Sequence, residues 1–357
     1  EKLRSGLQVA LADFTRDRNG NQLNHAVVVP FPVKGKFMIV LSTKRVWTTW
    51  LTVLKRRKLY IGVDLDRTVV DCYTLEKLEA VIRSAELSER EKALAILHLS
   101  ALNHYRNTNM MPQYLRALYR DIGVPDEKGA ISICRENGGR VVLTRYANGD
   151  PILVLVRPGW EALLSVFKAD YYTCFITQAS SIHASAVLEA LGAHALEETD
   201  ESGIGLKVIC RDADNKKTYK KSFSLAGAGA TKCFVGLDDL LDGSDESRSN
   251  AEGVSIWERD DLKVVLKPVP YHAYSEEAGQ SDQVPLEMCS ILLKSIHHRF
   301  FSAVDQVLDS PNVCDVFSQE LPRLDSILAY YGRNNITSAQ AVASFVNKTI
   351  QNFQKKE

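Results

Sequence analysis

Hydrophobic and polar positions change their spacing several times along the chain, and each change predicts a different kind of element. Up to about residue 58, short apolar runs such as HAVVVPFPV and KFMIVL are separated by turn residues, which is typical of β-structure. Residues 59–63, LYIGV, form a continuous apolar run that predicts a buried strand. From residue 74 to 123 apolar residues recur at helical spacing, and Ser88 with Glu91 predicts a capping box at a helix start.

The pattern then changes to short runs. AISIC and RVVLTRY flank RENGG and predict a β-hairpin. Strands and helices alternate after it. The strands are PILVLV, YYTCFIT, GLKVIC and KCFVGLDD, and the helices between them are RPGWEALLSVFKA, SSIHASAVLEALG and a short YKKSFSLAG. This alternation predicts right-handed crossovers and a mostly parallel sheet.

The expected architecture is therefore α/β, with a doubly wound parallel sheet. Residues 59–275 form the core, and residues 74–149 interrupt the alternation as a cap-like helical and hairpin insertion. Residues 1–58 are expected to form a β-rich N-terminal region and residues 276–357 a helical C-terminal region. LEMCSILLKSIHHRFFSAV is the clearest amphipathic segment of that region.

Composition excludes several function classes. Lysine plus arginine equals aspartate plus glutamate at 44 each, so no global field recruits nucleic acid or a membrane surface. No run of about 18 apolar residues is present, which argues against a membrane span. The seven cysteines are scattered and form no C-x-x-C pair, which argues for a reducing compartment and against a zinc site or disulfide framework.

Polar residues follow three of the expected strands at the point where each one ends. Because parallel strands present their carboxyl ends at one edge of a sheet, these groups should gather there. Several carboxylates pooled together repel one another unless a hard cation such as Mg²⁺ screens them. One aspartate could then attack a phosphoester, its neighbour could move the proton, and a hydroxyl and a lysine could hold the phosphoryl group. The candidates are Asp64, Asp66, Thr68, Thr177, Lys220, Lys221, Asp238 and Asp239.

The order of these motifs resembles the haloacid dehalogenase (HAD) superfamily of phosphatases. Within it, the details resemble the C-terminal-domain (CTD) phosphatases of RNA polymerase II, closest in layout to plant CTD-phosphatase-like proteins. The resemblance covers about residues 59–305. It is carried by VDLDRTVVD, LVRPGWEALL, CFITQAS, KKSFSL, FVGLDD and IWERDDLKVVLKPVPYHAY.

The resemblance implies a role for each candidate. Asp64 would be the nucleophile and a metal ligand, and Asp66 the general acid and base, which also gives the metal its carbonyl. Thr177 would bind the phosphoryl group together with Lys221, with Lys220 as the alternative lysine. The other assignments are Asp239 as the second metal carboxylate, Asp238 as the group that orients the lysine or a metal-bound water, and Thr68 among the phosphate-binding residues.

These expectations describe a Mg²⁺-dependent phosphoprotein phosphatase that forms an aspartyl-phosphate. Its substrate would be phosphoserine in an extended peptide such as the RNA polymerase II tail, and its compartment the nucleus. A protein partner could also use the N-terminal β-rich region or the C-terminal helices, and nucleic-acid binding is left open. Two alternatives remain: a phosphatase for nucleic-acid 3′-phosphates or small phosphoesters, and a non-catalytic scaffold. Arg67 and the arginine-free GLDDLLDG depart from the family pattern and bear on substrate preference.

Overall fold

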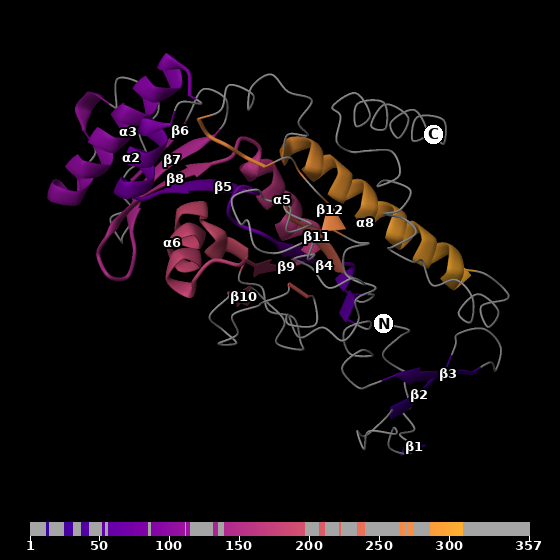
Figure 1. Ribbon diagram of the computed structural model, residues 1–357. Helices are drawn as coiled ribbons and strands as arrows, with labels where there is room; N and C mark the ends of the chain where they lie inside the picture. The colour runs from indigo at the N-terminus through magenta and orange to yellow at the C-terminus, as the bar shows by residue number, and fades with distance from the viewer. Residues whose placement is uncertain are drawn as a thin grey trace, which may run out of the picture.

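The computed structural model describes two sheets, the helices that pack on them and a separate N-terminal three-stranded sheet (Figure 1). The described residues are 12–13, 25–30, 37–42, 52–53, 56–84, 87–110, 112–114, 131–134, 139–196, 207–210, 221–222, 234–239, 265–266, 268, 270–274 and 286–309. In the N-terminal sheet β1 (Ala12–Asp13) pairs with β2 (His25–Pro30), and β2 pairs with β3 (Phe37–Ser42), both antiparallel.

The central sheet has five strands in the order β10-β9-β4-β11-β12, and every neighbouring pair is parallel. The strands are β4 (Leu59–Val63), β9 (Tyr171–Ile176), β10 (Lys207–Ile209), β11 (Phe234–Leu237) and β12 (Val265–Leu266). The chain builds outward from β4 through β9 to β10 and then returns to the other side of β4 with β11. The carboxyl end of β4 therefore lies at the topological switch point, where open α/β sheets bind their ligands.

Three helices cover the central sheet or extend from it. α5 (Trp160–Asp170) leads into β9 and packs against both β9 and α8 (Leu286–Asp309). α6 (Ser181–Leu191) follows β9, and the short 3₁₀ turn η1 (Ala193–Leu196) follows α6. β4, β9 and β11 are buried along their whole length, because both faces of a parallel sheet are normally covered. This confirms the expected α/β class and its parallel sheet.

The second sheet is antiparallel, in the order β5-β8-β7-β6. Its strands are β5 (Val70–Tyr73), β6 (Ile131–Cys134), β7 (Arg140–Arg145) and β8 (Pro151–Val156). The hairpin of β6 and β7 was expected. The assignment of PILVLV to the parallel alternation was wrong, because β8 pairs with β5 and β7 in antiparallel register. A run buried on both faces looks the same in sequence whichever sheet it joins.

Two helices pack with each other and against the second sheet: α2 (Leu75–Arg83) and α3 (Glu89–Thr108). Figure 1 shows this group on one side of the central sheet, joined to it through β5 and β8. The expected capping box is present, because Ser88 and Glu91 exchange side-chain and backbone hydrogen bonds. Within the described residues, no helix is long and apolar enough to cross a membrane.

One expected helix is absent from the part of its range that the structure describes. Of the short helix expected at residues 219–227, only Lys221 and Ser222 are described, and neither is helical. Lys221 sits in a β-bridge instead. The expected domain boundaries stay a prediction.

Candidate active site

The loop that follows β4 reverses the chain within six residues and places three polar side chains at the switch point. Asp64 donates its backbone N–H to the carbonyl of Leu237, so the end of β4 is fixed to the end of β11. Arg67 adopts a left-handed backbone conformation with φ of 62°. Its N–H donates to Val70, and the chain then enters β5. The DLDRT segment is thus a tight turn between the two sheets.

Asp64 and Asp238 share one lysine. The Nζ atom of Lys221 lies 2.7 Å from Oδ1 of Asp64 and 2.6 Å from Oδ2 of Asp238. All three side chains are nearly inaccessible, at 10% exposed for Asp64, 3% for Lys221 and 0% for Asp238. The backbone of Asp238 is held by its N–H donating to Leu266 of β12. Lys221 therefore neutralises one of two buried carboxylates and fixes the orientation of both.

Asp239 is held by Thr68. The hydroxyl of Thr68 donates to Oδ1 of Asp239 at 2.7 Å and accepts the backbone N–H of Asp239 at 2.9 Å. Since a hydroxyl has one proton, Thr68 has no donor left for a phosphate. In this structure Thr68 positions Asp239, and its expected place among the phosphate-binding residues stays a prediction.

The other oxygen of Asp239 is unsatisfied. Oδ2 is buried and has no hydrogen-bond partner among the described residues, and the nearest cation, Nε of Arg67, lies 3.9 Å away. A buried carboxylate oxygen without a donor costs free energy unless a cation or water meets it. We call Asp64, Lys221, Asp238 and Asp239 the acidic cluster. Its three carboxylates offer oxygen atoms within 4.8 Å of one another.

Burial dominates the ionisation of this cluster. It raises the pKa of Asp64 well above its usual range, against the opposing charge of Lys221. It also raises the pKa of Asp239, although the hydrogen bond from Thr68 acts in the opposite direction. Burial disfavours the charged form of Lys221, but Asp64 and Asp238 outweigh that effect and raise its pKa. Lys221 therefore keeps its charge between the carboxylates, and a divalent cation would favour the ionised form of Asp64 and Asp239 in the same way.

These residues fit a hard divalent cation. Mg²⁺ prefers one or two carboxylates completed by waters, and the cluster supplies three carboxylates, one of them with an unpartnered oxygen. Asp64 and Asp239 would hold the ion, since no described residue hydrogen-bonds to Oδ2 of Asp239, whereas Oδ2 of Asp238 already accepts from Lys221.

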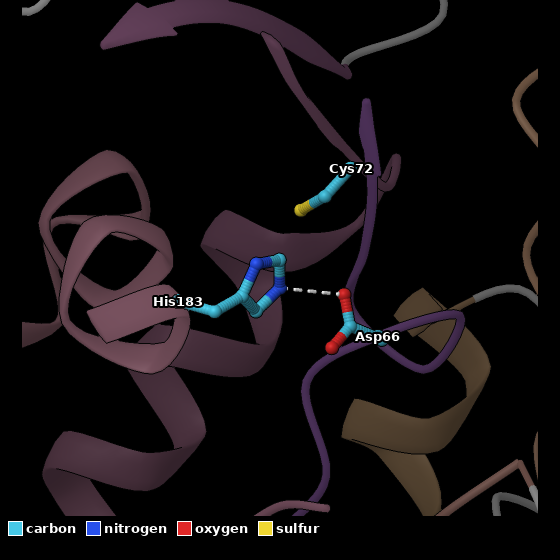
Figure 2. Close-up of side chains that lie close together, drawn as sticks. All are labelled: Asp66, Cys72 and His183. Atoms are coloured by element: carbon cyan, nitrogen blue, oxygen red, sulfur yellow. Dashed lines mark hydrogen bonds and ion pairs between the residues drawn. The ribbon is translucent and has the colours of Figure 1, made fainter. Parts of the chain in front are cut away.

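Asp66 points to a different set of partners (Figure 2). Its Oδ1 lies 2.9 Å from Nε2 of His183, which belongs to the first turn of α6, and Nδ1 of His183 lies 3.1 Å from the hydroxyl of Tyr146. Partial burial opposes ionisation of Asp66, but the hydrogen bond and charge of His183 outweigh it and lower its pKa. Cys72 of β5 completes this group, and burial raises the pKa of its thiol well above the usual range.

Sequence reasoning missed His183. The available signal was its place in SSIHASAV, because the first turn of a helix that follows a parallel strand begins at the carboxyl edge of the sheet. A single histidine in this helix carries no motif, so only its position could have pointed to Asp66.

Thr177 lies where the sheet edge requires it. It follows β9, the neighbour of β4, is buried, and donates its backbone N–H to Ile209 of β10. Its hydroxyl oxygen accepts the N–H of Ala179 at 3.1 Å, which leaves the hydroxyl proton to a ligand. Lys220, the alternative lysine, lies outside the described residues, whereas Lys221 is in the cluster.

Arg157 has a structural role in the described fold. Its guanidinium donates to the carbonyl of Thr68 at 3.0 Å, and its backbone N–H donates to the carbonyl of Val69. The guanidinium also lies 5.7 Å from the ring centre of Tyr271. Arg157 therefore stabilises the end of the DLDRT turn through hydrogen bonds to the carbonyls of Thr68 and Val69.

Comparison with known proteins gives structural neighbours only. No family model matches the chain, and no curated protein matches it by sequence. The solved structures that match include the RNA polymerase II CTD phosphatase Fcp1 and a variant of the fission yeast enzyme bound to beryllium fluoride. The identities are 14% and 13%, each alignment covers 79% of this chain and 73% of the other, and the TM-score is 0.45 in both. These are phosphatases of the type that the sequence motifs resemble.

Proposed function

We propose that this protein is a Mg²⁺-dependent phosphatase that acts through an aspartyl-phosphate on Asp64. The observation that carries the proposal is the acidic cluster at the carboxyl end of β4. It joins a buried aspartate fixed by a lysine at 2.7 Å to a second aspartate whose buried oxygen meets no hydrogen-bond partner in the described part of the chain. A buried set of three carboxylates with one lysine is costly for stability, which favours a catalytic role.

The residues divide the reaction between them. Asp64 attacks the phosphorus with a carboxylate oxygen, while Lys221 holds that carboxylate in place and faces the phosphoryl oxygens. The free hydroxyl proton of Thr177 donates to the same phosphoryl group. Mg²⁺, when bound, screens the carboxylates and the charge that builds up on the phosphoryl oxygens.

Asp66 handles the proton on the leaving oxygen and then on the attacking water. Its low pKa keeps it ionised in the resting protein, so it must take up a proton before it can act as an acid. Nε2 of His183 lies 2.9 Å from Oδ1 of Asp66, so the imidazole is the adjacent group through which this proton can pass. Because the side chain of Asp66 is 40% exposed, water reaches the pair.

The substrate class we propose is phosphoserine in an extended, proline-containing peptide, such as the CTD of RNA polymerase II, with action in the nucleus. The support is the set of sequence motifs that resemble CTD phosphatases. The solved Fcp1 structures are of proteins described as CTD phosphatases, and their likeness to this chain adds no weight to the substrate.

The test is hydrolysis of an aryl phosphate by the full chain with and without Mg²⁺, comparing wild type with Asp64→Asn. We expect metal-dependent turnover in the wild type and a loss of at least about 10⁴-fold in the variant, since the nucleophile is removed. Asp170→Asn is the control, because Asp170 ends α5 just before the amino end of β9, at the opposite edge of the sheet.

Three substrate panels then separate the candidates. Preference for phosphoserine peptides over oligonucleotide 3′-phosphates and small phosphoesters supports the proposed substrate. Preference for either of the others moves the function to that alternative. Absence of turnover on all three, with folded protein, identifies the non-catalytic scaffold.

A further inference from the structure

We propose that Asp66, Cys72 and His183 form a second metal site, which binds Zn²⁺ or a cation of similar chemistry. We call these three residues the mixed cluster. They come from three separate elements, the loop after β4, β5 and α6, and Figure 2 shows their side chains facing one another. One ligand atom from each lies within 4.8 Å of the other two.

The donor types distinguish this site from the acidic cluster. The acidic cluster offers only oxygen, which suits Mg²⁺, whereas the mixed cluster offers a carboxylate oxygen, a thiol sulfur and an imidazole nitrogen, which suit Zn²⁺. Three protein ligands with a water in the fourth position make a common zinc geometry. The absence of a C-x-x-C pair argued against zinc from the sequence. That argument does not hold for the folded chain, because the fold brings together ligand residues that are up to 117 positions apart.

The distances allow a cation with little movement. Bonds of about 2.0–2.3 Å in a tetrahedral site hold ligand atoms roughly 3.5 Å apart, and the three ligand atoms here already lie within 4.8 Å of one another. The side chains of Asp66 and His183 are 40% and 19% exposed, so a cation and its water have a route in from solvent. Cys72 is buried and forms the floor of the site.

Tyr146 supplies the supporting contact that metal-binding histidines usually have. Its hydroxyl lies 3.1 Å from Nδ1 of His183, so the imidazole can carry its proton on Nδ1 and donate to Tyr146 while Nε2 binds the cation. In the metal-free state Nε2–H donates to the carboxylate of Asp66 instead. The cation thus takes the place of the Nε2 proton and of the thiol proton of Cys72, both of which pass to solvent while Nδ1–H donates to Tyr146, and the thiolate and carboxylate balance the two positive charges of the cation.

The consequence for activity rests on the proposed phosphatase function. A cation held by Oδ1 of Asp66 and Nε2 of His183 occupies both ends of the hydrogen bond that supplies the leaving-group proton. The mixed cluster would therefore inhibit the enzyme when zinc fills it, while Mg²⁺ in the acidic cluster supports turnover.

The test is Co²⁺ binding to the full chain under reducing conditions, with excess Mg²⁺ present to fill the acidic cluster. A cysteine thiolate on Co²⁺ gives an intense near-ultraviolet charge-transfer band. We expect the band in the wild type and in Cys174→Ser, a control for a buried cysteine outside the cluster. We expect it to vanish in Cys72→Ser and to need about 100-fold more Co²⁺ in His183→Gln. No band in the wild type, or a band that persists in Cys72→Ser, overturns the proposal.

A second readout separates this inference from the proposed function. Zn²⁺ should inhibit the wild type at saturating Mg²⁺, and Cys72→Ser should need about 100-fold more Zn²⁺ for the same inhibition. A charge-transfer band without phosphatase activity supports the site and counts against the proposed function. Phosphatase activity without the band does the reverse. Far-ultraviolet circular dichroism checks folding, and Cys72→Ala serves if the serine variant is unfolded.

Discussion

Asp64 and Asp66 are two residues apart in one turn, yet the acidic cluster and the mixed cluster that they belong to are built in opposite ways. Asp64 is 10% exposed and meets a lysine that is 3% exposed, whereas Asp66 is 40% exposed and meets a histidine that is 19% exposed. The partner of Asp64 bears a fixed charge. The partner of Asp66 is an imidazole whose two ring nitrogens meet different groups, Asp66 and Tyr146.

The difference matches two different tasks. A nucleophile must be held in one position, and the strand ends of β4 and β11 with Lys221 provide that. A group that gives and takes protons needs contact with water and a partner that can exchange them, and α6 provides His183. One turn can serve both tasks because the side chains of Asp64 and Asp66 reach different neighbours, Lys221 and His183.

The largest expected effect comes from Lys221→Met, which removes the lysine that holds Asp64 in the acidic cluster. The change leaves Asp64 and Asp238 buried without their cation, so we expect a loss of about 3–5 kcal/mol in the free energy of unfolding without Mg²⁺. Turnover should fall at least about 10³-fold. Urea denaturation and steady-state kinetics measure the two effects.

Two variants control this experiment. Lys168→Met changes an exposed lysine on α5 and should alter neither quantity. Adding Asp238→Asn to Lys221→Met removes one of the stranded charges, so the double variant should be more stable than the single one. Equal stability of the two would show that Lys221 does not stabilise Asp238 through charge.

The next effect comes from Thr68→Val, which keeps the shape of the side chain and removes the hydroxyl that holds Asp239. We expect about 1–3 kcal/mol of destabilisation from the unsatisfied backbone N–H and carboxylate. Mg²⁺ affinity, measured by calorimetry, should fall about 10–100-fold, as for other residues that orient metal ligands. A Mg²⁺ affinity equal to that of the wild type would assign Thr68 a purely structural role.

The sequence was sufficient for the parts of the site that lie on strand ends. Apolar runs that stop at Asp64, Thr177 and Asp238 predict one shared edge, because parallel strands align their carboxyl ends. The family resemblance favoured Lys221 with Lys220 as the alternative, and Lys221 lies in the cluster, although the helix expected around it is absent where described. A polar residue that directly follows an apolar run can be recognised from the neighbouring residues alone, so a single sequence is enough to find it.

The rest depended on tertiary pairing. β5 and β8 join the antiparallel sheet because of their register with each other, which burial patterns do not reveal. That pairing brings Cys72 beside the loop of Asp66, and the packing of α6 brings His183 to the same place. The contacts of Thr68 depended on the fold for a related reason, since the sequence does not show that its hydroxyl meets Asp239.

A smaller effect is expected in how the stability and the Mg²⁺ affinity of the acidic cluster depend on pH. Burial raises the pKa of Asp64 and Asp239 above their unfolded values, so the metal-free fold binds these protons more tightly than the unfolded chain does. That part of its stability is greatest at low pH and is lost as pH rises through the raised values. Mg²⁺ must displace the protons, so its affinity should rise with pH, by up to about tenfold per unit for one proton displaced. Melting temperatures with and without Mg²⁺ measure this, and a Mg²⁺ shift that is constant with pH would contradict it.

The smallest effect is expected from His183→Gln, measured on substrates with different leaving groups. This variant is the sharpest test of whether His183 supplies the proton that Asp66 transfers. Glutamine retains an N–H donor that can reach Asp66 but cannot exchange its proton near neutral pH. An alkyl phosphate such as phosphoserine needs a proton on its leaving oxygen, whereas an aryl phosphate with an acidic phenol does not. We expect kcat to fall about tenfold for phosphoserine peptide and less than about twofold for the aryl ester. An equal fall for both would mean that His183 only positions Asp66, and no fall would mean that Asp66 draws its proton from water, leaving α6 with no part in the reaction.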